Sequence, residues 1–544
     1  MGVTAKIATP DLLKYNGQDC LATWYVNETH KPTMIADQQE QLYEELFKPT
    51  VITLLQTELC GMPINPKKVQ FAKLHLVSIE HTCLDYFNNS KLIQDFHFTQ
   101  LIALAEKMTA KAKKKIYDIT DPIIAREVFN PGSDTQLRAL IFDYMGYDII
   151  NLTKGKQAST SKGTIEKLIN HAKTPEHKEI FEHLIKLADV SILLSTFIPS
   201  MEKAQRLPDG SYRLYGNFNL GGTQSLRLSS SDPNLQNIPS HSIFAQIIKE
   251  CFEPIIGWLF FGSDFDALED KTNALITKDP NKLKIYTDGF CGHCLRAFSY
   301  FGDKMNGIIE TVTSINSIKK LYPDLRQDSK APTFALTYGG SFHTLMKNCG
   351  FTKPQAKQIE KMYHQLYTVA DKWVDNLVEQ AKKIGYIPLA FGGRIRTPLL
   401  AKTVGKVKVP FAAQKEARSA GNAATQSYCF LTQRAMNEFR ERVWASPYIY
   451  TILPAATIHD AAYYMGQDNA DLIKWANDNL IDCMAWQQLP ELMHPTIKIS
   501  SGLEIYWPSW GNKVKIPNNA SKQQIKALCL KAEQEEKAKQ LITP

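Results

Sequence analysis

Two short apolar stretches, far apart in the sequence, each end in an aspartate. Residues 257–270 read G-W-L-F-F-G-S-D-F-D-A-L-E-D, and their apolar start predicts a buried strand that delivers Asp264 at its end. Residues 455–464, A-A-T-I-H-D-A-A-Y-Y, predict a second apolar strand that delivers Asp460. Two such carboxylates can bind a pair of Mg²⁺ ions about 3.5–4 Å apart, an arrangement that supports in-line phosphoryl transfer. An aspartate at a strand end is also a common turn or cap residue, so other parts of the chain must decide.

Length and composition limit the class of protein. A chain of 544 residues is expected to divide into several domains, and 44% hydrophobic with 22% charged residues is typical of a soluble globular protein. No apolar run approaches the roughly 20 residues of a membrane span, and the N-terminus lacks a signal-peptide core. We therefore expect an intracellular, cytoplasmic chain without a membrane. The net charge of +8 permits a polyanionic partner without requiring one.

The ten cysteines are spread thinly, and reduced thiols are the default for an intracellular chain. One pair, in Cys291-Gly292-His293-Cys294, copies the C-G-H-C sequence of disulfide oxidoreductases. That motif is convincing when a strand precedes it in a thioredoxin-like unit, but here K-L-K-I-Y-T-D-G-F precedes it. We interpret the motif as a coincidence and keep a thiol oxidoreductase as an alternative.

The first 200 residues are mostly helical in pattern. A helix over residues 8–30 carries Tyr15 and Asp19 on one face. From residue 88 to 128 the helical pattern loosens, and this segment holds a lysine cluster that is either a solvated face or a phosphate contact. The cluster contains Lys107, Lys111, Lys113, Lys114 and Lys115.

Two later stretches carry polar groups at regular positions. Residues 325–340 place Arg326, Lys330, Phe334 and Tyr338 four apart along one predicted helix face, a set that suits a nucleotide, with charges for phosphates and rings for a base. The alternative is a helix with a basic start and a buried aromatic end. Pro332, inside this helix, is expected to kink it.

Residues 215–240 are dense in Ser, Asn and Gln and are either an irregular loop or a functional one. A later helix places three polar side chains four residues apart, where they can bond bases or sugars or face water. They are Arg418, Asn422 and Gln426. The Lys/Glu/Gln-rich helix at residues 520–540 is expected to be peripheral.

The order of these motifs resembles the family A DNA polymerases, the bacterial DNA polymerase I type. S-L-R-L-S-S-S-D-P-N-L-Q-N-I-P is similar to the family's T-G-R-L-S-S-x-x-P-N-L-Q-N-I-P, and D-F-D-A-L-E is similar to the first catalytic motif, D-Y-S-Q-I-E. R-Q-D-S-K-A-P-T-F-A-L-T-Y-G resembles the nucleotide-binding helix, R-x3-K-x3-F-x3-Y-G, and I-H-D-A resembles V-H-D-E. The resemblance covers roughly residues 8–510, and four motifs in order make it specific.

The resemblance implies an α+β right-hand fold, with an antiparallel palm sheet and helical fingers and thumb. Template-directed synthesis of DNA from dNTPs on a primer–template, as in phage DNA replication, is the implied activity. The implied parts are an exonuclease remnant at 1–40, a thumb at 41–205 with an insertion at 88–128, palm at 206–275, fingers at 276–425, palm at 426–512 and a basic helical tail at 513–544.

Residue roles follow from the same resemblance. Asp264 and Asp460 would hold two Mg²⁺ ions, for which Mn²⁺ can substitute. Arg326, Lys330 and His293 would bind the triphosphate, Phe334 would stack near the base and sugar and discriminate against dideoxynucleotides, Tyr338 would lie at the templating position, and Glu269 would reject ribonucleotides. The residues implied to line the primer–template are Arg227, Asn234, Gln236, Asn237, Arg418, Asn422, Gln426 and His459.

Three residues depart from the family pattern: Ala461 replaces a glutamate, Leu226 replaces a glycine, and Pro332 lies inside the nucleotide helix. They suggest a divergent branch, for which phage polymerases are natural candidates, placing the chain in the host cytoplasm. Tyr15 and Asp19 match the last motif of the 3′–5′ exonuclease domain, whose other carboxylates lie upstream. We therefore expect no proofreading from this chain alone. Either the chain was cut from a longer one, or a separate exonuclease subunit docks at residues 1–40; a processivity factor is expected at 88–128.

Two further alternatives stay open from the residues. One is a degenerate polymerase fold that serves as a non-catalytic nucleic-acid clamp, which the presence of Asp264, Asp460, Arg326 and Lys330 disfavours. The other is a polymerase that makes RNA, which Glu269 disfavours.

Overall fold

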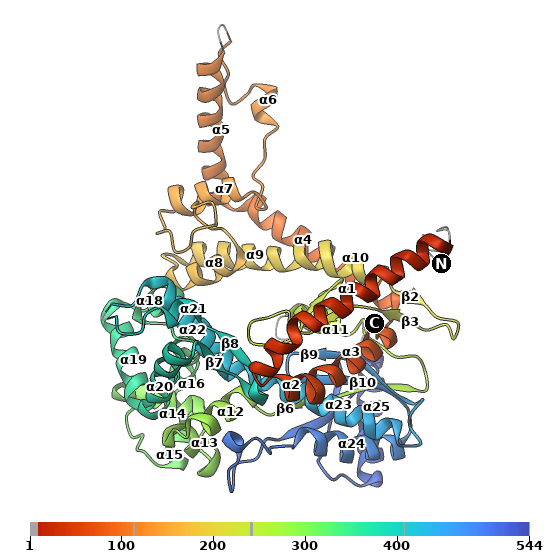
Figure 1. Cartoon of the computed structure of the whole chain (residues 1–544). Helices are drawn as coiled ribbons and strands as arrows, with labels where there is room; N and C mark the ends of the chain where they lie inside the picture. Colours follow the sequence, from red (N-terminus) through yellow and green to blue (C-terminus); the bar gives the residue numbers. More distant parts are fainter. Residues whose placement is uncertain (1–8, 113–114, 240–242, 407, 543–544) are drawn as a thin grey trace.

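A five-stranded antiparallel sheet lies at the centre of the computed structural model, which describes residues 9–112, 115–239, 243–406 and 408–542 (Figure 1). The strand order across the sheet is β12, β11, β6, β10, β9, with bounds Lys513–Ile516, Ser501–Tyr506, Trp258–Phe265, Ala461–Gln467 and Ile452–Ile458. Helices cover the sheet and form two bodies beside it, which confirms the predicted α+β class. The stretch 455–464 is a hairpin rather than one strand, because a two-residue turn separates β9 from β10.

The two faces of the sheet are covered by different parts of the chain, because side chains alternate along each strand. Phe261 and Tyr464 belong to a core built with helices α23 (Phe430–Trp444) and α24 (Ala470–Met484). Phe260 on β6 belongs to the second core, on the opposite face, together with residues from the N-terminal third of the chain. The sheet therefore joins distant parts of the sequence around the end of β6.

The C-terminal segment 513–544, expected to be a peripheral tail, contributes to this core. β12 pairs with β11 at the edge of the sheet, and α25 (Lys522–Ile542) packs against α24 with Ile525 fully buried. The Lys, Glu and Gln residues of α25 mostly face solvent. In the sequence, their number hides the few apolar positions that make the contact with α24.

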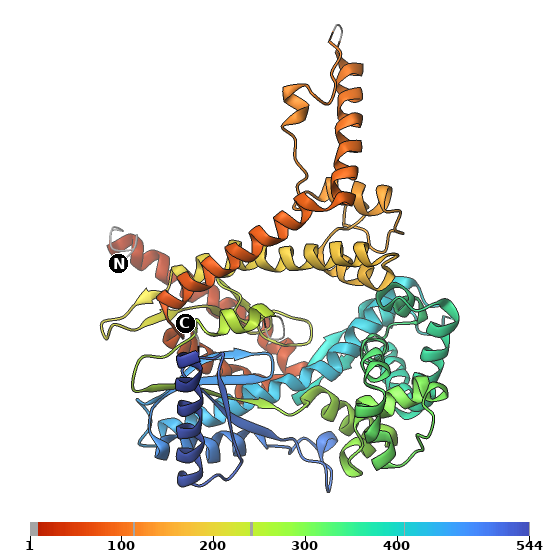
Figure 2. The ribbon, with the colours of Figure 1, turned by 180° about the vertical axis from the view of Figure 1, so that it is seen from behind.

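A second helical body rises above the sheet (Figures 1 and 2). Within the segment 88–128, the loosened pattern is in fact the 21-residue helix α5, which stands out from the body with the short α6 beside it. Only Ile93, Phe96 and Ala105 of α5 are buried, so the helix has little apolar periodicity to reveal it. The helices of this body are α4 (Pro66–Asn89), α5 (Lys91–Lys111), α6 (Pro122–Ala125), α7 (Asp134–Arg138), α8 (Lys162–Leu168), α9 (Pro175–Ile192) and α10 (Ile198–Glu202).

One helical stretch in the described residues, Pro175–Glu202, is long and apolar enough by composition to cross a membrane. No run of this kind is expected from the sequence alone. Some apolar side chains of this stretch, among them Ile180, Phe181 and Val190, are fully buried against other helices of the chain, whereas Ile192 is exposed. This burial is typical of a core helix in a helical body.

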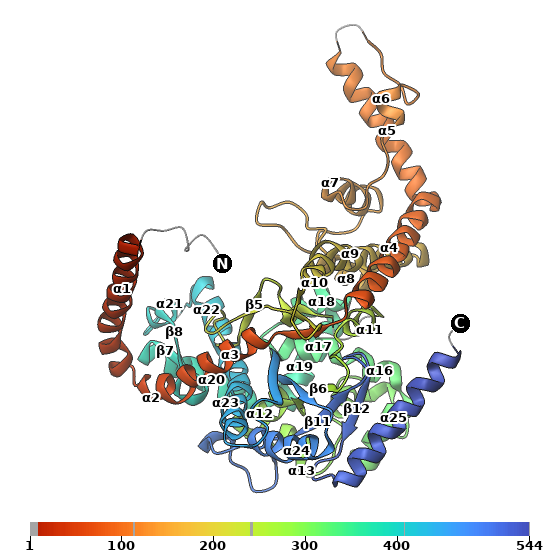
Figure 3. The same ribbon diagram turned by 90° about the vertical axis from the view of Figure 1, so that its right-hand side faces the viewer.

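The first helix, α1 (Thr9–Ala36), lies along the outside of the molecule (Figures 1 and 3). The expected helix at 8–30 is confirmed, but none of its residues is buried. Exposed apolar side chains, among them Leu12, Leu13, Trp24 and Val26, are spread around the helix rather than gathered on one face. Contacts just after the helix fix its base, where Arg394 and Arg396 pair with Asp37.

A third body, helical and on one side of the sheet, spans residues 268–426 (Figures 1 and 2). Its tip meets the second body where Asn170 Nδ2 donates a hydrogen bond to Asn348 O at 3.0 Å. This body also contains a short hairpin, formed by β7 (Tyr386–Pro388) and β8 (Arg394–Arg396). The helices are α12 (Leu268–Thr277), α13 (Pro280–Thr287), α14 (Gly292–Phe301), α15 (Val312–Leu321), α16 (Pro323–Asp328), α17 (Lys330–Thr337), α18 (Phe342–Cys349), α19 (Lys353–Leu366), α20 (Thr368–Ile384), α21 (Pro398–Ala401) and α22 (Phe411–Gln426).

Candidate active site

The two aspartates singled out in the sequence lie beside each other at one end of the sheet. Asp264 lies near the end of β6, directly opposite Ala461, the first residue of β10. Asp460 precedes Ala461 in the two-residue turn, where His459 adopts a positive φ of 56°. The hairpin thus brings the second carboxylate beside the first, as predicted.

Glycine at position 262 is required by this packing. In the antiparallel register Gly262 faces Tyr463, and a Cβ atom at this position would lie 2.7 Å from Tyr463 Cδ1. Because Gly262 has no side chain, the ring of Tyr463 can lie across β6 two residues before Asp264.

Like charges gather around Asp264. Partial burial, followed by the charges of Asp460 and Glu504, raises the pKa of Asp264 to about 7. Glu504, which sequence reasoning missed, stands on the neighbouring strand β11 and shares the face of Asp264, because Gly502 opposes Asp264 and side chains alternate. Ala461 leaves the family's glutamate position without a carboxylate, and it is buried.

The donor set at this point fits a divalent cation. Two neighbouring carboxylates each disfavour the ionised form of the other, and a cation between them stabilises both ionised forms. Mg²⁺ is often held by one or two carboxylates, with water and phosphate as the remaining ligands. Among the described residues, no group of three or more His, Cys, Asp or Glu side chains forms a closed metal cage. The residues present therefore fit an open metal site with two aspartate ligands.

The predicted helix at 325–340 is divided. α16 ends at Asp328 and α17 begins at Lys330, with Ser329 between them in helical geometry. Pro332 is the third residue of α17, in the first turn, where a missing N–H costs little. The interruption at Ser329 lies in the turn that precedes Pro332, the part of a helix that a proline perturbs.

His293, Arg326 and Lys330 form one cationic cluster. Burial, then the charges of Arg296, Arg326 and Lys330, lower the pKa of His293 to about 4, so the imidazole is neutral near pH 7. His293 Nδ1 and Arg326 Nε are buried and have no hydrogen-bond partner. Donors held without partners beside a lysine form a site that favours an anion.

Glu269 joins two other predicted residues. Its carboxylate accepts hydrogen bonds from Tyr338 Oη at 2.9 Å and from Arg227 Nη2 at 3.3 Å. Asn422 Nδ2 on α22 donates to Tyr338 O at 3.1 Å. The structure therefore brings Glu269, Tyr338, Arg227 and Asn422 together. Phe334, 53% exposed, is the most open of the four residues predicted on the nucleotide helix.

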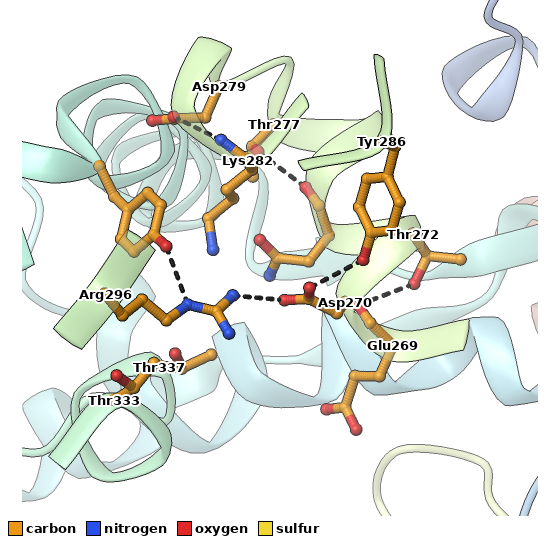
Figure 4. Close-up of polar contacts among 12 residues, drawn as sticks. Glu269, Asp270, Thr272, Thr277, Asp279, Lys282, Tyr286, Arg296, Thr333 and Thr337 are labelled. Atoms are coloured by element: carbon orange, nitrogen blue, oxygen red, sulfur yellow. Dashed lines mark hydrogen bonds and ion pairs between the residues drawn. The ribbon is translucent and has the colours of Figure 1, made fainter. Parts of the chain in front are cut away.

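A buried polar network anchors the helix that carries Glu269 (Figure 4). Asp270, the next residue, accepts from Arg296 Nη2 at 2.9 Å and from Tyr286 Oη at 2.8 Å. Arg296 Nε donates to Tyr367 Oη at 2.9 Å, and Lys282 lies 4.3 Å from the centre of the Tyr367 ring. No sequence motif pointed to this network, which ties α12 to α13, α14 and α20.

The polar segment at 215–240 forms two short strands, β4 (Asn217–Asn219) and β5 (Ser229–Ser231), and a 3₁₀ turn at Leu235–Asn237. Leu226, at the family's glycine position, has a φ of 65°, a conformation that favours glycine, so this chain tolerates strain there.

The predicted primer–template residues fall into three groups. Arg227, Gln426 and His459 line a cavity of about 240 Å³ together with Glu269 and Asp460. Asn234 and Asn237 line a second cavity, of about 480 Å³, against the second helical body, although Asn234 also caps the 3₁₀ turn through Gln236 N. Arg418 and Asn422 line a third, of about 450 Å³, with Gly339 and Gly340.

Tyr15 and Asp19 lie on α1, apart from every other predicted site residue. Lys107 and Lys111 end α5, whereas Lys115 pairs with Asp121 at 2.8 Å. Lys113 and Lys114 lie outside the described residues.

Comparisons with known proteins agree with this geometry. The model of DNA polymerase family A matches residues 97–496. DNA polymerase I of Bacillus subtilis (strain 168) is 27% identical over 390 residues, 71% of this chain and 38% of the relative, and the thermostable DNA polymerase I of Thermus aquaticus is 29% identical over 286 residues, 52% of this chain and 32% of the relative. The chain therefore spans less than two fifths of the length of these relatives.

The fold also has a solved counterpart. The POL domain of Pol1 from M. smegmatis, solved in complex with DNA primer-template and dNTP, superposes with a TM-score of 0.67 at 19% sequence identity. The match covers 88% of this chain and 72% of that one, so the right-hand architecture expected from the motifs is confirmed. With most of its length matched by the family model and its two aspartates adjacent in the sheet, this chain belongs to DNA polymerase family A.

Proposed function

We propose that this chain adds dNTPs to the 3′ end of a primer, directed by a DNA template, through phosphoryl transfer at Asp264 and Asp460. The observation that carries the proposal is the juxtaposition of these two carboxylates, brought together from distant strands with mutually unfavourable charge. A role in phage DNA replication is part of the same proposal.

Family A DNA polymerases use divalent metal ions. In this chain Asp264 and Asp460 would hold two Mg²⁺ ions, and Mn²⁺ can substitute. When bound, such ions stabilise negative charge on the attacking and leaving oxygens. The two carboxylates supply the oxygen ligands and remain ionised when the positive charge is present.

The cationic cluster binds the triphosphate in this proposal. Arg326 and Lys330 neutralise phosphate charge, and His293 donates a hydrogen bond from its neutral ring at pH 7. Phe334 offers an exposed ring on which the base and sugar can stack. Glu269 limits the space at the sugar C2′, and its bond to Tyr338 holds the templating position until a base arrives. The protein contributes position and electrostatics, which supply most of the catalysis in phosphoryl transfer.

The primer–template runs past the three cavities described above. The Pol1 domain with this fold was solved with primer-template DNA, which supports the assignment. The proposed contacts are Arg227, Asn234, Gln236, Asn237, Arg418, Asn422, Gln426 and His459.

The domain boundaries of this proposal follow the motifs. They are 1–40 for the exonuclease remnant, 41–205 for the thumb with its projecting part at 88–128, 206–275 and 426–512 for the palm, 276–425 for the fingers and 513–544 for the C-terminal segment. A separate exonuclease subunit on α1 and a processivity factor on the projecting α5–α6 hairpin are the proposed partners, acting inside the cell without a membrane.

Primer extension on a defined template with Mg²⁺, offering dNTPs and rNTPs in separate reactions, tests the central claim. We expect extension with dNTPs only. Asp468→Ala, an exposed aspartate after the far end of β10, is the control that retains activity. Template binding without any extension would favour a non-catalytic clamp.

Proofreading has its own test. The purified chain is incubated with a labelled, 3′-mismatched primer and Mg²⁺ without dNTPs, and we expect no shortening because one motif carboxylate, Asp19, on an exposed helix cannot hold two metal ions. Shortening that disappears in Asp19→Ala would overturn this part of the proposal.

A further inference from the structure

The C-G-H-C motif, which the polymerase function leaves unused, begins helix α14. Cys291 is the residue that caps this helix, and Cys294 is its third residue. Cys291 is half-buried, whereas Cys294 is fully buried directly behind it. The side chains of Cys291 and Cys294 are hydrogen-bonded to each other, so the two sulfurs lie in contact and can be joined by a disulfide.

Arg326 faces this pair. Its Nη2 atom lies 3.9 Å from Cys291 Sγ. Burial alone would raise the pKa of Cys291, but hydrogen bonds from Cys294 and Arg326 and the guanidinium charge outweigh it and lower the pKa. The pKa of Cys294 is raised to about 11 by burial and by Cys291, so the two thiols have different roles.

The other cysteines of the described chain lack this environment. Burial raises the pKa of the thiol in seven of them, and at Cys429 it outweighs a hydrogen bond from the Arg227 guanidinium. They are Cys60, Cys83, Cys251, Cys349, Cys429, Cys483 and Cys529.

We propose that Cys291 and Cys294 are a modification site, a dithiol that hydroperoxides oxidise to an intramolecular disulfide beside Arg326. The Cys291 thiolate attacks one peroxide oxygen, the O–O bond breaks, and the leaving alkoxide or hydroxide takes a proton from solvent. The sulfur of Cys294 then attacks the Cys291 sulfenic acid, forming the S–S bond and releasing water. Two thiols lose two hydrogens, and the hydroperoxide is reduced to an alcohol, or water, and a second water.

Oxidation of this cysteine pair is coupled to nucleotide binding. This coupling rests on the proposed function. A triphosphate that engages Arg326 withdraws the cation from Cys291, which raises the pKa of the thiol. A rise of one unit lowers the thiolate fraction about tenfold at a pH below the pKa. Bound dNTP is therefore expected to slow oxidation of this pair.

The test is chemical and needs no polymerisation. The full chain is treated with dilute hydrogen peroxide, capped with N-ethylmaleimide and analysed by peptide mass spectrometry. We expect the 291–294 peptide to be two hydrogens lighter and uncapped, and to recover its thiols with dithiothreitol. Cys291→Ser and Cys294→Ser abolish this product, and Cys349→Ser, a half-buried cysteine on α18 without a partner, leaves it unchanged. Arg326→Gln slows capping of Cys291 several-fold, whereas Arg326→Lys preserves most of the rate.

Two results would overturn the proposal of a reactive dithiol. One is capping of Cys291 no faster than capping of Cys349. The other is oxidation of Cys291 to the sulfinic acid without formation of a disulfide. A separate reaction repeats the peroxide treatment in the presence of saturating dNTP and primer–template. If the disulfide forms at the same rate with and without dNTP, the dithiol stands and the assignment of Arg326 to the triphosphate fails.

Discussion

The network around Asp270 predicts that Arg296 holds the start of the third helical body rigid. Arg296 is 6% exposed and makes two bonds of 2.9 Å, to Asp270 and to Tyr367. Arg296→Met keeps most of the packing of the aliphatic part of the side chain and leaves Asp270 with one hydrogen-bond donor, Tyr286, and the nearby charge of Lys282. Removing one partner of a buried ion pair costs about 3–5 kcal/mol, and we expect about 3 because the Asp270 side chain is 39% exposed.

Hydrogen exchange measures this cost locally. A loss of about 3 kcal/mol in the opening free energy of α14 corresponds to amide exchange about 100-fold faster. Arg442→Met is the matched control, since Arg442 makes ion pairs with two carboxylates but is 30% exposed, and its loss is expected to cost about 1 kcal/mol or less.

A double-mutant cycle separates the pair from its surroundings. Asp270→Asn in the Arg296→Met background should add little, giving a coupling energy of about 2 kcal/mol. Additive effects, or α14 amides that exchange within threefold of the parent, would show that the ion pair does not anchor α12.

Four further predictions follow from the site. Asp264→Ala and Asp460→Ala should each abolish primer extension and leave primer–template affinity largely intact in a binding titration, because phosphate contacts elsewhere supply most of it; extension within tenfold of the parent would contradict the assignment. The parent should discriminate against dideoxynucleotides, Phe334→Tyr should relax this, and Glu269→Ala should raise ribonucleotide use; equal use of ddNTP and dNTP by the parent would disprove the mapping. His293 should titrate by NMR with a pKa near 4 and shift upward when dNTP binds; since its folded pKa lies below the unfolded value of about 6.5, its contribution to stability is present above pH 6.5 and is lost as the pH falls toward 4. Neutralising Lys107 and Lys111 should shorten products in single-encounter extension with a shallower salt dependence, whereas unchanged lengths with a trap present would reject a role for α5.

Local patterns predicted the parts of the site that depend on local structure. Asp264 and Asp460 could be found because each follows an apolar run, and Arg418, Asn422 and Gln426 because one helix spaces them evenly. The partners of Glu269 could not be found, since Arg227 and Tyr338 lie 42 and 69 residues away and meet it only through tertiary packing.

Other misses have the same cause. Glu504 reaches the face of Asp264 through strand pairing across more than 200 residues, and Asp270–Arg296 joins two helices whose sequences show no shared motif. The sequence predicts a tail at β12 because an edge strand of four residues, K-V-K-I, resembles a charged linker until it is paired. The break at Ser329 depends on helix geometry that a four-residue spacing does not resolve.

Because no side chain of α1 is buried, hydrogen exchange in this helix can report the binding of a partner. A helix of 28 residues with no buried side chain is held only by its own helix–coil equilibrium and by the contacts at its base. Its amide hydrogens should therefore exchange with solvent far faster than those of α23 or β6, whose side chains lie in the core. Any molecule that covers α1 would register as slowed exchange in residues 9–36 while the rest of the chain stays unchanged, so the arrival of a partner can be read without a label and without knowing what the partner is.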